Sequence, residues 1–478
     1  MGWCLGYEDK IRIITFFNAK TQESPMAKKG VRKQTDSLGT LTIPKNVPYG
    51  IHTVRSLHNF SHNSLWSQDI IKSIITIKQA CAIANNELGE ISTKKKNAIV
   101  SACEKPFDPK NFPLSIYQAG SGTSTNMNVN EVLAHYASTT IPIHPNDDVN
   151  KGQSTNNVIP TAIRLTLLQK HEELLKQLTA VEKALAKKAT EFKSVIKSAR
   201  THLQDAVPIT LGQEFGAYAT AIRKHIQRIT FQKNFLTQLG IGGNAVGTGI
   251  NTKKQFKQKI VSNIKKLTTL QVTVSKDSIE STQFLTDILC YHSAIHDTCV
   301  DLNKIANDLR LLASGPNTGF GEIELPAVEP GSSIMPGKIN PSILEEQNMI
   351  CHRIFGNQTT LTISCTSGNL DLNTHMPVIG NTCVESCDLL IAGLHDLHTK
   401  CLSRIKANKK KCESYVYNSA ALATALNPHL GYDAVSALVK ESLKTKKTII
   451  ELVTKKKLLT KKQVETILNP VNLTKPNR

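Results

Sequence analysis

The stretch TAIRLTLLQKHEELLKQLTAVEKALAKKATEFKSVI, residues 161–196, decides the fold class of this chain. Apolar residues recur in it at intervals of three and four, and it contains neither glycine nor proline. This spacing predicts an amphipathic α-helix, because residues three and four apart share one face of a helix. The pattern extends from about Pro160 to Lys233, which predicts one or two long helices.

Two further stretches show the same helical spacing, one from about Glu280 to Leu312 and one from Ser342 to about Ile405. The glycine- and proline-rich insert SGPNTGFGEIELPAVEPGSS, residues 314–333, separates them. Three helical stretches of this length exceed what a compact single-chain core needs. We therefore expect a mainly α fold in which the apolar faces pack against each other and against further copies of the chain.

Composition along the chain suggests three domains behind a short extension. Residues 1–25 are expected to form a disordered extension, with Met26 as an alternative start. Residues 26–143 are interpreted as a smaller mixed domain, 144–407 as the central helical bundle, and 408–478 as a small C-terminal helical domain around the loop NPHLGY.

Composition also excludes several classes of protein. The chain has 478 residues, 40% of them hydrophobic, which fits a globular protein. It lacks the apolar run of about 18 residues that a membrane span needs and a clean signal peptide, so no membrane partner and a cytoplasmic location are expected. The formal charge of +20 comes from dispersed lysines, which argues against nucleic acid. The 11 cysteines show no C-x-x-C spacing, so neither a metal site nor a disulfide framework is indicated.

Four polar segments interrupt the helical pattern, and each lies beside a long helix. They are GSGTSTNMNVNE at 120–131, HPNDDVNKGQSTNN at 144–157, RTHLQDAVP at 200–208 and GSSIMPGKINPSILEE at 331–346. Hydroxyl and amide donors with a lysine suit a small ligand with two carboxylates. We expect the four segments to meet if the helices pack side by side with these loops at shared levels.

The segment at 331–346 is the most specific, since it combines glycines for loop mobility, two adjacent hydroxyls and a lysine before a helix. It resembles the signature of the aspartase and fumarase superfamily, and the resemblance extends from about Asp36 to Pro476. It implies a three-domain lyase with a homotetrameric helical core, active sites that each draw on three subunits, and a small dicarboxylate substrate. It also implies anti-elimination across a C2–C3 bond without a cofactor.

The resemblance also implies roles for individual residues. Ser332 matches the general base, which needs nearby backbone amides and Lys338 to stabilise its alkoxide. Lys338, Asn340 and Thr201 match residues that hold the α-carboxylate. The other carboxylate, which becomes an aci-carboxylate when the C3 proton leaves, matches the hydroxyl groups of Thr123, Ser154, Thr155 and Ser333.

Near the leaving group, the resemblance implies roles for His202 and Asn156, with Glu345 as the acidic partner that tunes the protonation of His202. Ser121 and Asn126 match supporting positions. The sequence departs from the usual pattern at three places, namely Asn157 in place of Asp, Ala199 in place of Gly and Asn317 in place of Arg.

Two branches of the superfamily remain open. FPLSIYQAGSGT, HPNDDVNK, GGNAVGTGINT and SGNLDLN resemble class II fumarases, whereas YGIHTVRSLHNF, LQDAVP, NDLRLLASGP, MPVIG and ESYVYNS resemble aspartate ammonia-lyases. The aspartate ammonia-lyase interpretation is favoured, and fumarate hydratase is the alternative. An inactive structural relative and a basic nucleic-acid-binding bundle are further hypotheses, and retention of Ser332, Lys338, Asn340 and His202 argues against the first of these.

Overall fold

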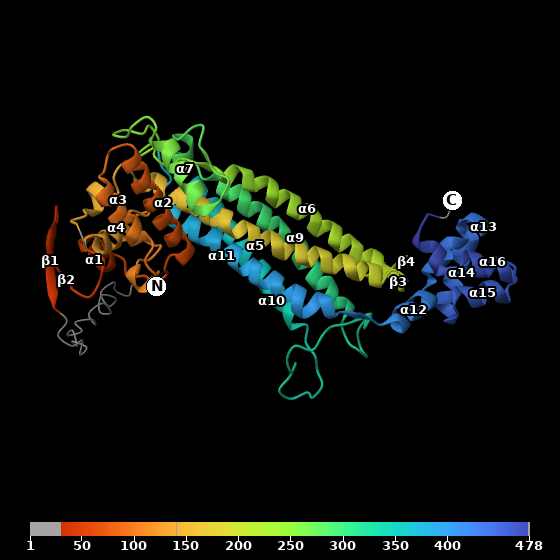
Figure 1. Cartoon of the computed structure of the whole chain (residues 1–478). Helices are drawn as coiled ribbons and strands as arrows, with labels where there is room; N and C mark the ends of the chain where they lie inside the picture. Colours follow the sequence, from red (N-terminus) through yellow and green to blue (C-terminus); the bar gives the residue numbers. More distant parts are fainter. Residues whose placement is uncertain (1–29, 140, 477–478) are drawn as a thin grey trace, which may run out of the picture.

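A bundle of long helices forms the middle of the molecule, with a smaller part at each end (Figure 1). The computed structural model describes residues 30–139 and 141–476, so the predicted extension at 1–25 lies outside the described residues. Five long helices form the bundle: α5 (Thr155–Glu191), α6 (Leu211–Leu236), α9 (Thr286–Leu312), α10 (Ser342–Thr366) and α11 (Met376–Asp396). The predicted mainly α fold is confirmed.

Helix α5 sets the length of the bundle. Its 37 residues correspond to about 55 Å at 1.5 Å per residue. The Ser154 side chain caps its start by accepting from the Asn156 amide at 3.2 Å. Leu174, Leu178 and Leu185 follow one helical face and are fully buried, which is the burial that the sequence period predicts.

The helical stretches break at turns that the spacing alone did not resolve. A hairpin of β3 (Ile196–Thr201) and β4 (Gln204–Thr210) separates α5 from α6. The stretch predicted from Ser342 to Ile405 is two main helices, α10 and α11, rather than one. The reason is the turn after α10, where Leu370 adopts a positive φ of 50° and the Asn373 side chain donates to the Ser364 carbonyl at 3.0 Å.

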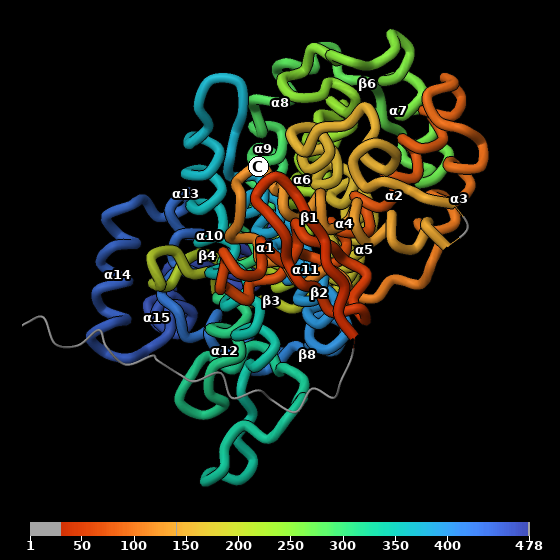
Figure 2. Tube along the Cα trace, turned by 90° about the vertical axis from the view of Figure 1, so that its left-hand side faces the viewer, coloured from red at the N-terminus to blue at the C-terminus, as the bar shows by residue number. Residues whose placement is uncertain are grey.

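The N-terminal part lies at the end of the bundle where α5 begins (Figure 1), and Figure 2 views the molecule from that end. It contains an antiparallel hairpin and four helices: β1 (Val31–Asp36), β2 (Gly39–Pro44), α1 (Ile51–Asn59), α2 (Gln68–Glu87), α3 (Thr93–Cys103) and α4 (Thr123–Ala137). The buried Glu131 carboxylate accepts from the amides of Gly50, His52 and Thr53 at 2.8–3.2 Å. It therefore satisfies the free N–H groups at the start of α1 and joins α1 to α4.

Short elements connect the bundle helices. They are β5 (Gln238–Leu239), α7 (Phe256–Thr268), β6 (Thr273–Val274), α8 (Glu280–Gln283), β7 (Ile323–Glu324) and β8 (Lys406–Ala407). Strands β5 and β6 pair in parallel, and β7 and β8 pair antiparallel. The second pair connects the segment after α9 to the start of the C-terminal part.

The C-terminal part has an apolar cluster of its own, which includes Leu426, Leu438, Leu452 and Val453. Its helices are α12 (Lys409–Asn418), α13 (Asn427–Leu430), α14 (Tyr432–Thr445), α15 (Ile449–Lys455) and α16 (Lys461–Ile467). This part lies at the end of the bundle that carries the β3–β4 hairpin (Figure 1). Among the described residues, no helix is both long and apolar enough to cross a membrane.

Candidate active site

The first group of predicted site residues lies where α4 and α5 begin. The Asn126 side-chain amide donates to Thr155 Oγ1 at 3.1 Å and to Asn150 Oδ1 at 3.3 Å. The hydroxyls of Ser121 and Thr123 are 2.8 Å apart. The structure therefore brings the segments at 120–131 and 144–157 together, as expected for two parts of one polar site.

The start of α5 is attached to the loop that follows α6. The Asn156 side chain donates to the Ala245 carbonyl at 2.8 Å, and the buried Asn157 side chain donates to the Asn244 carbonyl at 2.9 Å. An ionised aspartate cannot donate a hydrogen bond. Asn157, one of the departures from the superfamily pattern, can therefore make this hydrogen bond to the loop, whereas an ionised aspartate could not.

The second group lies on the β3–β4 hairpin. Thr201 pairs with Gln204, which leaves His202 and Leu203 as the two turn residues, with positive φ angles of 54° and 57°. Two-residue hairpin turns favour such angles, but glycine or asparagine adopts them at a lower cost than His or Leu. Both turn side chains are exposed in the single chain.

A buried ion network fixes the base of this hairpin. Arg200 Nη1 donates to Glu322 Oε1 at 2.9 Å, and Lys197 Nζ lies 2.9 Å from the other Glu322 oxygen. The Arg200 guanidinium also lies over the Phe320 ring, 4.2 Å from its centroid. The residues next to Thr201 and His202 are therefore attached to the segment that leads into the loop at 331–340.

The third group lies on that loop, which extends out from the bundle between α9 and α10 (Figure 1). The Asn340 side chain donates to the Gly331 carbonyl at 2.7 Å, closing the base of the loop. Ser332 Oγ accepts hydrogen bonds from the amides of Ile334 at 3.2 Å and Met335 at 3.0 Å. Ser333 and Lys338 are exposed.

Glu345 does not pair with the residue that the sequence suggested. Its carboxylate lies 3.6 Å from Arg310 Nη2, on the neighbouring helix α9. Within the part of the chain that the structure describes, no hydrogen bond or ion pair joins Glu345 to His202. The expected His202–Glu345 pair is thus not formed inside one chain.

The condition for all four segments to meet, namely loops at shared levels of side-by-side helices, does not hold within a single chain. Thr155 is the first residue of α5, whereas Thr201 follows the other end of that helix. The straight helix separates the two by about 50 Å. A complete site that uses both residues needs segments from different copies of the chain.

Sequence reasoning missed several buried charged residues that organise these segments, among them Lys78, Glu131 and Glu322. All three side chains are less than 10% exposed. A usable signal existed for Lys78, because it occupies a core position of the periodic stretch IITIKQACAIAN. A charged residue is rare at such a position unless it has polar partners.

A cavity of about 590 Å³ lies beside the first group and is lined in part by Asn146, Asp147, Asn150 and Gln153. Polar atoms provide most of this lining, which fits a hydrophilic ligand better than an apolar one. Among residues 30–139 and 141–476, no cluster of three or more His, Cys, Asp or Glu side chains could hold a metal ion.

The fold and these segments define a helical-bundle lyase. The chain matches the family described as "Lyase" over residues 39–356 and the "Fumarase C C-terminus" family over residues 422–475. It belongs to the aspartase and fumarase superfamily and is an enzyme of the lyase class.

Its relatives include carbon–nitrogen lyases and a fumarase. The aspartate ammonia-lyase of Helicobacter pylori is 40% identical over 461 residues, covering 94% of this chain and 98% of the relative. The Escherichia coli enzyme of the same name is 38% identical, covering 93% and 96%. Among solved structures, the class II fumarase of Schistosoma mansoni has a TM-score of 0.91 at 36% identity, covering 94% of this chain and all of that one.

Proposed function

We propose that the protein is an aspartate ammonia-lyase, which eliminates ammonia from L-aspartate to give fumarate in a reversible reaction. The observation that carries the proposal is the identity of about 40% to aspartate ammonia-lyases along nearly the whole chain. The contacts of Ser332 support the elimination chemistry that aspartate ammonia-lyases and fumarases share, because a serine base needs a surrounding that stabilises its alkoxide.

In the proposed mechanism Ser332 removes the proton from C3 of the substrate. A serine hydroxyl is a weak base, so its anion must be stabilised. The amides of Ile334 and Met335 already donate to Ser332 Oγ, and each becomes a stronger, charge-assisted donor when that oxygen is ionised. The C3 electron pair then forms the C2–C3 double bond as the C2–N bond breaks and ammonia leaves.

The carboxylate next to C3 carries the developing negative charge. Hydroxyl donors that are already in place stabilise this aci-carboxylate more than the ground state, which raises the rate. We assign this role to Thr123, Ser154, Thr155 and Ser333, and assign binding of the α-carboxylate to Thr201, Lys338 and Asn340. Ser121 and Asn126 support the first set.

We assign His202 and Asn156 to the region of the leaving group, with Glu345 as the acidic partner of His202. These residues lie far apart within one chain. The assignment therefore requires that each site combine segments of different subunits. The Glu345 that acts on a given His202 would then belong to another copy, which agrees with its contact to Arg310 within its own chain.

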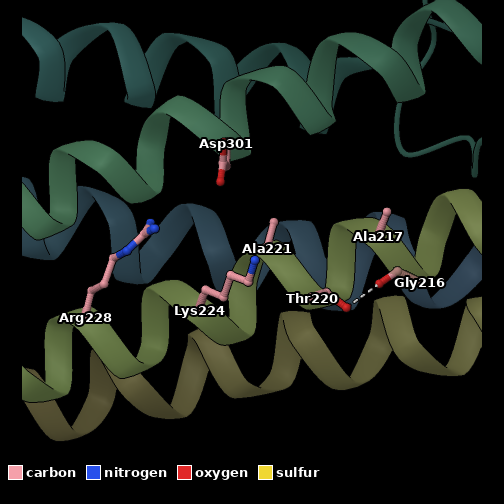
Figure 3. A pocket seen from close by; sticks show the side chains of 7 residues that line it. All are labelled: Gly216, Ala217, Thr220, Ala221, Lys224, Arg228 and Asp301. Carbon is pink, nitrogen blue, oxygen red and sulfur yellow. Dashed lines mark hydrogen bonds between the residues drawn. The ribbon is translucent and has the colours of Figure 1, made fainter.

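We propose a homotetramer as the assembly that completes the site. An uncovered stripe along α6 supports it: the small residues Gly216, Ala217, Thr220 and Ala221 line a groove of about 440 Å³ that Asp301 of α9 also borders (Figure 3). Phe231 and Phe235 continue the same helix and are 60% and 47% exposed. Small side chains permit close approach of a second helix, and exposed aromatic rings gain from burial.

Two measurements test the proposal. Ultraviolet absorbance should report fumarate formation when the purified protein receives L-aspartate, and light scattering should give four times the chain mass of 52.5 kDa. Absence of turnover with aspartate would refute the assigned activity. A monomer that is active with aspartate would refute the shared site.

Class II fumarate hydratase, which interconverts L-malate and fumarate, is the second candidate. It is supported by the likeness to the Schistosoma mansoni fumarase, with its TM-score of 0.91. The two reactions share the base, the carboxylate donors and the loop, and differ in the leaving group. Fumarate formed from malate alone would favour this candidate over the first.

A further inference from the structure

Lys78 lies in the middle of α2, and no step of the proposed mechanism uses it. Its side chain is fully buried, with Ile74, Ile77 and Cys81 on the same helical face. Burial lowers the pKa of Lys78 to about 7. Its Nζ donates to Asn150 Oδ1 at 2.8 Å and to Gln153 Oε1 at 2.9 Å, so both partners are neutral amides of the segment at 144–157.

Burying this lysine costs folding free energy, which indicates a role beyond packing. A buried ammonium group loses its hydration, and two neutral acceptors replace only part of it. An apolar side chain of similar length would fill the same space without that cost. The location of Lys78 under the first group of site residues suggests what the cation contributes.

A lysine amine imposes a direction on the hydrogen bonds around it. The ammonium group can only donate, and the neutral amine still has a hydrogen for each of the two amide oxygens. Asn150 must therefore turn Oδ1 towards Lys78, and its own Nδ2 then donates to the Gln153 carbonyl at 3.2 Å. If the Asn150 amide rotated by 180°, its Nδ2 would face two other donors, Lys78 Nζ and Asn126 Nδ2.

The orientation of the Asn150 amide also fixes the hydrogen bonds of Asn126 and Thr155. Asn150 Oδ1 also accepts from Asn126 Nδ2 at 3.3 Å, which fixes the orientation of the Asn126 amide. The same Asn126 nitrogen donates to Thr155 Oγ1 at 3.1 Å. Because Thr155 Oγ1 accepts this bond, the hydroxyl hydrogen of Thr155 is free to point elsewhere, towards a ligand oxygen.

We propose that Lys78 is a positioning residue for the substrate carboxylate, because it sets the direction of a hydrogen-bond chain that runs through Asn150 and Asn126 to Thr155. The chain ends with the Thr155 hydroxyl acting as a donor to the ligand. The inference rests on the proposed function, since Thr155 is assigned there to the carboxylate that becomes the aci-carboxylate. It adds a residue that never touches the substrate.

The test replaces Lys78 with methionine in the full-length protein and measures succinate binding by calorimetry together with aspartate turnover. Loss of one charge-assisted donor network predicts at least about a tenfold weaker succinate affinity and a fall in kcat/KM of at least the same factor. Lys170→Met is the matched control. Lys170 is a largely buried lysine of α5 that pairs with Asp69 at 2.7 Å, and this variant should keep the wild-type succinate affinity.

A second pair of variants separates direction from stability. Asn150→Asp retains an acceptor for both Lys78 and Asn126, although it loses the donor to the Gln153 carbonyl and adds a negative charge, whereas Asn150→Leu has no acceptor. Asn150→Asp should therefore bind succinate more tightly than Asn150→Leu, which should lose affinity as Lys78→Met does. This pair decides the question if Lys78→Met does not fold. Equal affinities for Asn150→Asp and Asn150→Leu would overturn the proposal, as would unchanged affinity in Lys78→Met.

Failure of the proposed function can be told apart from failure of this inference. A wild-type protein that binds succinate but does not turn over aspartate refutes the activity, and the succinate affinities of the variants still decide the role of Lys78. A wild-type protein that does not bind succinate overturns both.

Discussion

Acidification should weaken the helical bundle through His292, and replacing this residue with glutamine should remove that effect. His292 lies on α9, is fully buried and contacts two other bundle helices. One ring nitrogen, Nδ1, lies 2.6 Å from Gln358 Oε1, which can only accept, so Nδ1 carries the hydrogen. In the neutral ring Nε2 carries no hydrogen and lies 2.8 Å from Ser386 Oγ, which also donates to the Thr382 carbonyl at 3.1 Å.

The size and sign of the effect follow from the pKa of His292, which burial lowers from 6.5 to about 4. Between these two values the unfolded chain binds a proton that the folded chain does not, so stability is present above pH 6.5 and is lost as the pH falls. From about pH 7.5 to about pH 5 the loss is about 2 kcal/mol, at about 1.4 kcal/mol per pH unit below 6.5.

Urea unfolding followed by circular dichroism at both pH values, at one protein concentration, measures this loss. The wild-type protein should lose more stability on acidification than His292→Gln, and the difference should be about 2 kcal/mol. His58→Gln, at an exposed position, is the control and should behave as wild type. An equal acid-induced loss in His292→Gln and wild type would refute the reasoning.

Three further results are expected. Arg164→Leu should destabilise the bundle by about 3–5 kcal/mol in thermal unfolding, because it leaves Asp287, which Arg164 binds at 2.7 and 2.9 Å, without its partner; a loss below about 1 kcal/mol would contradict this. Ser332→Ala should lower kcat for aspartate by a factor of about 10² to 10⁴ while succinate affinity is retained. Coexpression of Ser332→Ala with Thr155→Val should restore part of the activity that each variant lacks alone, and no recovery would contradict a site shared between chains.

Much of the fold follows from local pattern. The period of three and four in residues 161–196 predicted a long helix, and α5 covers most of that stretch. The break between α10 and α11 was not predicted, because it depends on a turn in which Leu370 adopts a positive φ. A single non-glycine residue at positive φ has no clear sequence signal.

The candidate site divides in the same way. The candidate residues were predicted because hydroxyl, amide and lysine side chains gather in four short segments, and their roles remain a proposal. Their contacts within one chain did not follow from the sequence, since Glu345 contacts Arg310 and the His202 turn is exposed in the single chain. Pairing depends on which helices are neighbours, and sequence spacing does not contain that information.

The sequence by itself determined that the chain is mainly helical, because helical period is a local property. Its resemblance to a known superfamily predicted a lyase and proposed the side chains that the chemistry would use. Only the tertiary structure decided where those side chains lie. The length of α5 places Thr155 and Thr201 at opposite ends of the bundle, and the burial of Lys78 beneath Asn150 gives the hydrogen bonds of the first group their direction. Both depend on packing between segments far apart in the chain, which no local pattern specifies.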